Sequence, residues 1–394
     1  MAAGVVVIEA SELAARLETL VPIGRGPLGT TRLAWTGEDA ATGEWFREQA
    51  AGAGLRVEQD PAGNLWAVPD APPPWWAVGS HLDSVREGGS FDGALGVAAG
   101  FEVAAQAGGP IAVISFADEE GARFNTPTFG SRALTGVLDL GVLDRVDRDG
   151  IRLADGMRAA GVDPARIGDA PDWLSRLRGF VELHIDQTTE LQRAGIPAGV
   201  VRGLASRMRL RADIEGRADH SGTTPPADRR DALAAAARLI VAALDRSGDG
   251  LVATASRIEV EPNALTTVPA HASVWLDARS PDPERVDAWR AELEALDVGL
   301  PVALSLESRS AGCEFDPRLR ERLVALSEAL GARAPEMECY AGHDAGLIAA
   351  RLPAAMALVR NETGVSHSPA EHVELEDAAF GAELVLRLLR ELPA

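Results

Sequence analysis

Short apolar runs alternate along much of the chain with stretches in which polar and apolar residues have helical spacing. Four of these runs lie at residues 75–78, 111–117, 180–183 and 355–359. Their alternation with helical patterns indicates an α/β fold built around a sheet. We therefore expect a mixed sheet flanked by helices in the first and last parts of the chain.

Residues 206–314 have a different pattern. Residues 207–215 alternate like a half-exposed strand, residues 231–244 resemble an Ala-rich helix, and residues 251–260 and 272–278 read as further strands. This order predicts a smaller α+β domain, an antiparallel sheet with helices on one face. The expected organisation is a discontinuous main domain, residues 1–205 and 315–394, with an inserted domain at residues 206–314.

Three further segments give local predictions. Ser11 is expected to be the N-cap of a helix that continues to Leu20. Residues 36–54 predict a second helix, closed by Gly52 and Gly54. The Gly- and Asp-rich residues 139–172 are expected to form a surface excursion.

Residues that bind hard metal ions follow the predicted strands. The candidate ligands are His81, Asp92, Glu120, His184 and His367. Open α/β sheets place their sites at the carboxyl ends of strands, so these side chains are expected to meet there. Imidazoles and carboxylates without cysteine are typical of a catalytic pair of divalent ions, not of a structural zinc site.

The expected ligand sets share one carboxylate. Asp92 lies in a Gly-rich turn and is the expected bridge between the two ions. His81 and His184 would complete the coordination of one ion, and Glu120 and His367 would complete that of the other.

Two other carboxylates have expected roles beside these ligands. Adjacent Glu119 and Glu120 would divide the work, one binding metal while its neighbour accepts a proton from an activated water. An adjacent Glu-Glu pair usually lies on a solvated surface. This pair follows the apolar residues 111–116, which disfavours that interpretation. Asp83, two residues from His81, is expected to accept the second ring N–H of that histidine.

Four histidines are not among the ligand candidates. His220 lies in a polar, Gly-containing loop, where it either stabilises an oxyanion or caps a turn, and the residues alone favour the cap. His343 either faces a substrate or holds the start of a helix. His271 and His372 are interpreted as structural.

Composition excludes several classes of function. The chain has 38 Lys and Arg against 59 Asp and Glu, a net charge of −21, which argues against nucleic-acid or anionic-membrane surfaces. Apolar runs fall short of the roughly 20 residues that span a bilayer, and no secretory signal is expected. Cys313 and Cys339 are interpreted as buried small hydrophobes, as suits a reducing cytoplasm.

Eight segments in order resemble the amidase–hydantoinase–carbamoylase family, a branch of the co-catalytic metallopeptidase superfamily. They are residues 79–97, 116–124, 182–187, 220–233, 262–264, 276–279, 342–345 and 364–371. The resemblance covers nearly the whole chain. It implies a di-metal exopeptidase-like catalytic domain with a mixed sheet, and an inserted lid domain that joins a homodimer and whose residues complete the neighbour's site.

The resemblance also implies roles for single residues. Glu119 would be the general base, while Gln187, His220, Asn263 and Arg279 would bind substrate, with His220 acting on the oxyanion. His343 is a further candidate for binding substrate. A guanidinium fork suits a planar carboxylate, so Arg279 implies a small-molecule substrate with a free carboxyl group. The implied reaction cleaves the ureido C–N bond of allantoate or an N-carbamoyl-L-amino acid and releases ammonia and carbon dioxide. The implied cofactors are two divalent ions, Mn²⁺ or Zn²⁺ first, with Co²⁺ and Ni²⁺ as alternatives.

Some positions depart from the family pattern. Asp186 stands where Glu is usual, Thr188 and Thr189 where Gly and Pro are usual, and Asn125 where Gly is common. These departures put the identity of the substrate in question. Residues 359–365 are more similar to allantoate-type members than to the usual carbamoylase sequence. A dipeptidase or aminoacylase of the same superfamily is the alternative, and a binding protein that lost catalysis is a third possibility that the intact Glu119 disfavours.

Overall fold

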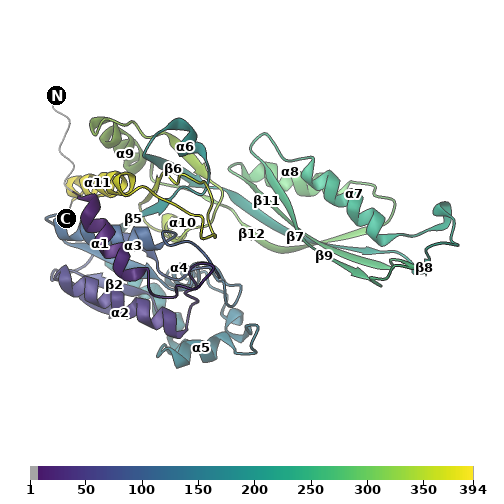
Figure 1. Ribbon diagram of the computed structural model, residues 1–394, viewed down its shortest axis with the longest axis horizontal. Helices are drawn as coiled ribbons and strands as arrows, with labels where there is room; N and C mark the ends of the chain where they lie inside the picture. The colour runs from purple at the N-terminus through teal and green to yellow at the C-terminus, as the bar shows by residue number, and fades with distance from the viewer. Residues whose placement is uncertain (1–7, 394) are drawn as a thin grey trace. The chain divides into compact units, whose positions relative to one another are not determined.

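The computed structural model describes residues 8–393, which form two compact units (Figure 1). The first unit contains the described residues up to Arg202, residues Glu314–Met337 and those from Gly342 onward. The second contains Gly203–Cys313 and the short segment Glu338–Ala341.

A mixed sheet forms the centre of the first unit, in the order β1-β2-β4-β3-β5-β15-β6-β13, with β14 beside β6. Strands β3, β4, β5 and β15 are parallel, whereas β1, β2 and β6 pair antiparallel with their neighbours. The bounds are β1 Arg56–Gln59, β2 Leu65–Val68, β3 Trp75–His81, β4 Ile111–Phe116, β5 Leu177–Ile185, β6 Ala198–Leu204, β13 Cys313–Glu314, β14 Glu336–Cys339 and β15 Ala354–Val359. The four parallel strands are those predicted from the apolar runs.

Helices cover this sheet, as the α/β prediction required. They are α1 Ala10–Leu20, α2 Gly37–Gly52, α3 Ala94–Gln106, α4 Phe129–Leu134, α5 Leu153–Ala159, α6 Glu190–Ala194, α9 Pro317–Ala329, α10 Asp344–Ala349 and α11 Leu375–Glu391, with 3₁₀ segments Leu140–Asp144 and Pro164–Arg176. Helix α3 is almost entirely buried between the sheet and α11. Gly96 makes this approach possible, because a Cβ there would lie 2.2 Å from the carbonyl oxygen of Leu183.

Two local predictions in this unit are wrong. Ser11 lies inside α1, and the N-cap position belongs to Glu9, whose side chain makes no capping bond. Residues 139–172 are not a simple surface excursion, because Val142, Leu153 and Met157 are buried in a satellite core with Trp35. The second helix is as predicted, begun by the Thr36 side chain, which accepts the N–H of Asp39.

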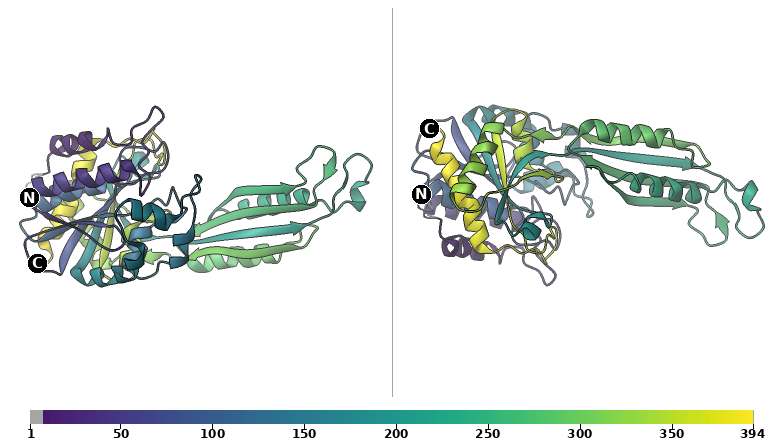
Figure 2. Two further views of the ribbon diagram at one scale, coloured as in Figure 1. Left: turned by 90° about the horizontal axis from the view of Figure 1, so that it is seen from below. Right: turned by 90° about the horizontal axis from the view of Figure 1, so that it is seen from above.

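The second unit is a four-stranded antiparallel sheet in the order β12-β7-β11-β9, with α7 and α8 packed on one face (Figure 2). Its elements are β7 Ser206–Glu215, β8 Asp219–His220, α7 Ala232–Leu244, β9 Val252–Glu261, β10 Thr267–Val268, β11 His271–Ser280, α8 Pro283–Glu294 and β12 Val302–Ser310, with a 3₁₀ turn at Pro226–Asp228. The predicted α+β pattern is present, but α8 and β12 were not predicted. Among the described residues of the whole chain, no helix has the length and apolar character needed to cross a membrane.

Candidate functional site

The candidate ligands gather at one edge of the main sheet. His81 is the last residue of β3 and His184 the penultimate residue of β5. Glu119 and Glu120 follow β4, while Asp92 lies next to Gly93, the N-cap of α3. Because β3, β4 and β5 are parallel, their carboxyl ends lie at the same edge, and the local chain direction positions these side chains.

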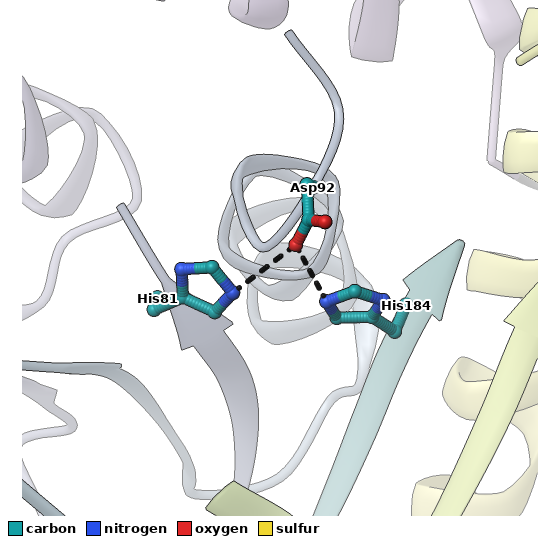
Figure 3. Close-up of side chains that lie close together, drawn as sticks. All are labelled: His81, Asp92 and His184. Carbon is teal, nitrogen blue, oxygen red and sulfur yellow. Dashed lines mark ion pairs between the residues drawn. The ribbon is translucent and has the colours of Figure 1, made fainter. Parts of the chain in front are cut away.

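Asp92 joins the first group of ligands. Its Oδ1 lies 3.4 Å from Nε2 of His81 and 3.1 Å from Nε2 of His184 (Figure 3). All three side chains are buried. Burial alone would raise the pKa of Asp92, but the nearby imidazoles, His184 first and then His81, hold it well below its usual value.

The other oxygen of Asp92 belongs to a second group. Oδ2 lies 3.7 Å from Nε2 of His367, and the same nitrogen lies 3.3 Å from Oε2 of Glu120. His367 has a φ of 57° and a side chain that is 51% exposed, so this group opens toward solvent. Asp92 therefore presents one oxygen to each group, which is the geometry a bridging carboxylate needs.

The donor set fits divalent cations. One ligand atom from each member of a group lies within 4.8 Å of the others. Nε2 of His81, Nε2 of His184 and Oε1 of Glu120 are buried and have no hydrogen-bond partner among residues 8–393. Buried polar atoms of this kind are normally paired, so their grouping around Asp92 and His367 is best satisfied by coordination to bound cations.

Glu119 lies beside these groups with its side chain 9% exposed. Its Oε2 lies 3.8 Å from Nε2 of His81, one of the candidate ligands. Burial, followed by the charges of Asp344 and Glu120, raises its pKa well above the usual value, although His81 opposes the shift. A carboxylate with raised proton affinity at this position can accept a proton from a water and hold it.

Asp83 does not orient His81 in the predicted way. Nδ1 of His81 lies 3.0 Å from the backbone carbonyl oxygen of Asp83, whereas the nearest carboxylate oxygen is 3.6 Å away. The Asp83 carboxylate instead accepts the backbone N–H groups of Glu119 and Glu120, each at 3.1 Å. Asp83 therefore holds the loop that carries the two glutamates, and its carbonyl orients the histidine.

Two residues that position Asp92 were not predicted. Ser366 donates from Oγ to Oδ2 of Asp92 at 2.6 Å. Oε1 of Glu371 accepts the backbone N–H groups of Phe91 and Asp92 at 2.7 and 3.0 Å. A Cβ on Gly89 would lie 2.3 Å from this carboxylate, so the turn before Asp92 needs glycine there. Both residues lie within four positions of His367, and this closeness in sequence to a candidate ligand was the signal that could have identified them.

Two of the predicted substrate-binding residues, Gln187 and His343, belong to the first unit. Gln187 donates from Nε2 to Oδ2 of Asp92 at 3.3 Å and to Oγ of Ser366 at 3.2 Å. The ring of His343 is buried 4.4 Å from that of His184, and neither of its nitrogens has a hydrogen-bond partner in the described part of the chain. Burial and then His184 lower the pKa of His343 well below its usual value. A neutral ring can donate one N–H to a bound molecule.

The other predicted substrate residues belong to the second unit. The His220 side chain is exposed, and its Nδ1 accepts the N–H groups of Gly222 and Thr223 at 3.0 and 3.2 Å, which caps its own turn. Asn263 is exposed in the loop between β9 and β10. Arg279 donates from Nε to Asp277 and from Nη1 to the carbonyl of Tyr340.

The remaining two histidines lie on the surface of their units. His271 is bonded to Glu215 and Ser273, and His372 lies between Glu362 and Glu374. These contacts agree with a structural interpretation.

The sequence model of peptidase family M20/M25/M40 matches residues 67–391. The chain is 36% identical to an N-carbamoyl-L-amino acid amidohydrolase of Geobacillus stearothermophilus, over 98% of this chain and 99% of that protein. It is 30% identical to an allantoate amidohydrolase of Escherichia coli K12, over 95% of this chain and 96% of that one. A crystal structure of an amidase of the hydantoinase/carbamoylase family from Burkholderia multivorans superposes with a TM-score of 0.84 at 30% identity, covering 98% of each chain.

The chain therefore belongs to peptidase family M20/M25/M40, and within it to the hydantoinase/carbamoylase amidases. The resemblance inferred from the eight motifs is confirmed.

The departures from the family pattern have local explanations. Oδ1 of Asp186 accepts the N–H and hydroxyl of Thr188, and Oδ2 accepts the N–H of Leu191, so the shorter acid is used to begin α6. Asn125 has a φ of 53°, a region that asparagine tolerates better than most residues with a side chain. Asp186 thus stabilises the turn that leads into α6, and Asn125 adopts a left-handed backbone conformation in place of glycine.

Proposed function

We propose that the protein is a metal-dependent amidohydrolase that cleaves the ureido C–N bond of allantoate or an N-carbamoyl-L-amino acid. The observation that carries the proposal is Asp92, whose two oxygens face two separate ligand groups beside the buried Glu119. Relatives along nearly the whole chain are named for these two substrates, which supports the reaction class but does not choose between them.

The side chains divide the chemistry as follows. His81 and His184 with Asp92 would hold one divalent ion, and Glu120 and His367 with Asp92 the other. Bound ions would supply Lewis acidity, which lowers the pKa of a water and polarises the ureido carbonyl. The proposed metal is manganese or zinc, with cobalt and nickel as alternatives that the donor set also accepts.

Glu119 moves the proton in this scheme. It accepts a proton from the water that attacks the ureido carbon, and it returns that proton to the departing nitrogen. The C–N bond to the terminal amino group breaks, ammonia leaves, and the remaining carbamate loses carbon dioxide. In this scheme Gln187, Asn263 and the neutral His343 bind the ureido group, His220 stabilises the oxyanion and Arg279 binds the substrate carboxylate.

We also propose a homodimer joined through the inserted domain. Leu233, Val241 and Leu244 are exposed along one face of α7, and Leu265 is fully exposed in the loop that carries Asn263. An apolar face and an apolar loop tip favour burial against a second copy, which would bring Asn263 to a neighbour's site. The cytoplasmic location expected from the composition stays a prediction.

Ammonia release from a substrate panel tests the proposal. Allantoate, several N-carbamoyl-L-amino acids, dipeptides and N-acyl amino acids would be compared at equal concentration with the metal-loaded protein. Release of ammonia from at least one ureido acid, with no cleavage of dipeptides or acyl amino acids, is expected. Cleavage of a dipeptide or acyl amino acid without any ureido hydrolysis would instead identify a peptidase or aminoacylase.

A further inference from the structure

We propose that Asp277 sets the substrate specificity of the protein by fixing which end of the Arg279 guanidinium is free to bind a carboxylate. The inference rests on the proposed function of Arg279 and concerns a positioning residue that does not itself touch substrate. All the groups involved belong to the second unit.

Asp277 and Arg279 lie two residues apart on β11 and therefore on the same face of the sheet. Their neighbours on the buried face, Leu276 and Ala278, pack under the helices, so both charged side chains are on the face without helices. Asp277 Oδ1 accepts Nε of Arg279 at 2.9 Å. Asp277 Oδ2 accepts Nε of Arg209, its partner across the β11–β7 pair, at 2.8 Å.

A guanidinium has five N–H donors, one on Nε and two on each Nη. In Arg279 the Nε donor is used by Asp277, and one Nη1 donor is used by the carbonyl of Tyr340 at 2.6 Å. The side edge that contains Nε is therefore occupied. Within residues 8–393 the other three donors, one on Nη1 and two on Nη2, have no partner, so an incoming carboxylate must meet the Nη end of the fork.

Electrostatics favour the same arrangement. Burial would raise the pKa of Asp277, but Arg279 and Arg209 outweigh it and hold the pKa below the usual range. Together the two guanidinium groups and the Asp277 carboxylate carry a net charge of +1, which favours the approach of a substrate anion. An arginine already held in its binding geometry loses less side-chain entropy when the anion binds.

The experiment pairs protein variants with paired substrates. An N-carbamoyl-L-amino acid and its α-carboxamide, which lacks the carboxylate, are hydrolysed by wild type, Asp277→Ala, Asp277→Glu and Arg279→Ala. Asp277→Ala is expected to raise KM for the acid about tenfold, the size of one charge-assisted hydrogen bond, with little change in kcat. The KM for the carboxamide should not change, and Asp277→Glu should restore part of the loss.

Asp213→Ala is the matched control. Asp213 makes the same kind of contact two residues from its partner, accepting Nη2 of Arg211 at 2.9 Å on β7, but it does not contact Arg279. This variant should leave both KM values at wild-type levels.

The outcomes separate the inference from the proposed function. If Arg279→Ala discriminates between acid and carboxamide but Asp277→Ala does not, the positioning role is refuted and the carboxylate site stands. A lower KM for the acid in Asp277→Ala would mean that added positive charge outweighs orientation, which also refutes it. If Arg279→Ala raises both KM values equally, the carboxylate role of Arg279 and the positioning role of Asp277 are both refuted, while ureido hydrolysis itself stands. Hydrolysis of no ureido acid in the substrate panel, allantoate included, would refute the proposed function.

Discussion

Ser366 provides a sharp test of how Asp92, the proposed bridging carboxylate, is held. Its hydroxyl donates to Oδ2 of Asp92 at 2.6 Å, within the short range typical of a hydrogen bond to a charged acceptor. Such a bond contributes about 1.5–3 kcal/mol, and about 1.4 kcal/mol corresponds to a tenfold change in affinity. Ser366→Ala would thus weaken metal binding by about 10- to 100-fold, which matches the usual effect of losing an outer partner of a ligand.

The structure narrows the expected loss of metal affinity. Gln187 also donates to Oδ2 of Asp92, at 3.3 Å, and keeps one donor on that oxygen when the hydroxyl is removed. We therefore expect an effect near the lower end, about tenfold. Both ions should be affected, because Asp92 belongs to both ligand groups.

The assay is metal affinity, measured by competition with a chelating indicator and by isothermal titration calorimetry. Ser368→Ala is the control, because Ser368 lies in the same loop and its hydroxyl accepts the N–H of Ala370, with no bond to Asp92. Equal affinities for the two variants would refute the assignment of Ser366 as a support for the bridge.

Three further variants test other parts of the account. Glu119→Gln should retain both metals in elemental analysis yet lose about 10²- to 10⁴-fold in kcat, as expected for a general base, and near-wild-type turnover would remove Glu119 from that role. Val241→Asp, on the exposed face of α7, should convert the proposed wild-type dimer to a monomer in light scattering, whereas a variant that keeps the dimer mass would exclude this face from the interface. Arg176 lies 4.5 Å and 4.9 Å from the ring centres of Trp173 and Trp75, so Arg176→Met should lower the free energy of unfolding by about 1–2 kcal/mol in denaturant titration, and an unchanged midpoint would mean that these contacts contribute little.

The main sheet could be predicted because its parallel strands are buried on both sides. Each of β3, β4 and β15 is buried at every position, and such strands appear in the sequence as uninterrupted apolar runs. The edge strand β12 has no such run, since most of its residues are partly or fully exposed, and it was missed. Helix α8 buries only Val286, Trp289 and Leu293, so its pattern is mainly polar. Its start was nevertheless signalled, by Asp282 as N-cap and Pro283 at the first helical position.

The grouping of the candidate ligands could be predicted because their chemistry and their places after strands are both visible in the sequence. The contacts that position them could not. Glu371 supports the backbone of Asp92 from 279 positions away, and only the folded chain brings them together. Asp83 shows a different limit, because the sequence identifies the residue but does not say whether its carbonyl or its carboxylate meets His81.

The central claim is that two ions held by the Asp92-centred groups enable this chain to hydrolyse a ureido bond. The most direct measurement is ammonia release by chelated protein as manganese or zinc is added back, with bound metal counted at each step. No ammonia release is expected without metal, and activity should rise to a maximum near two ions per chain. Full activity in the chelated protein, or none with both ions bound on any ureido acid, would contradict it.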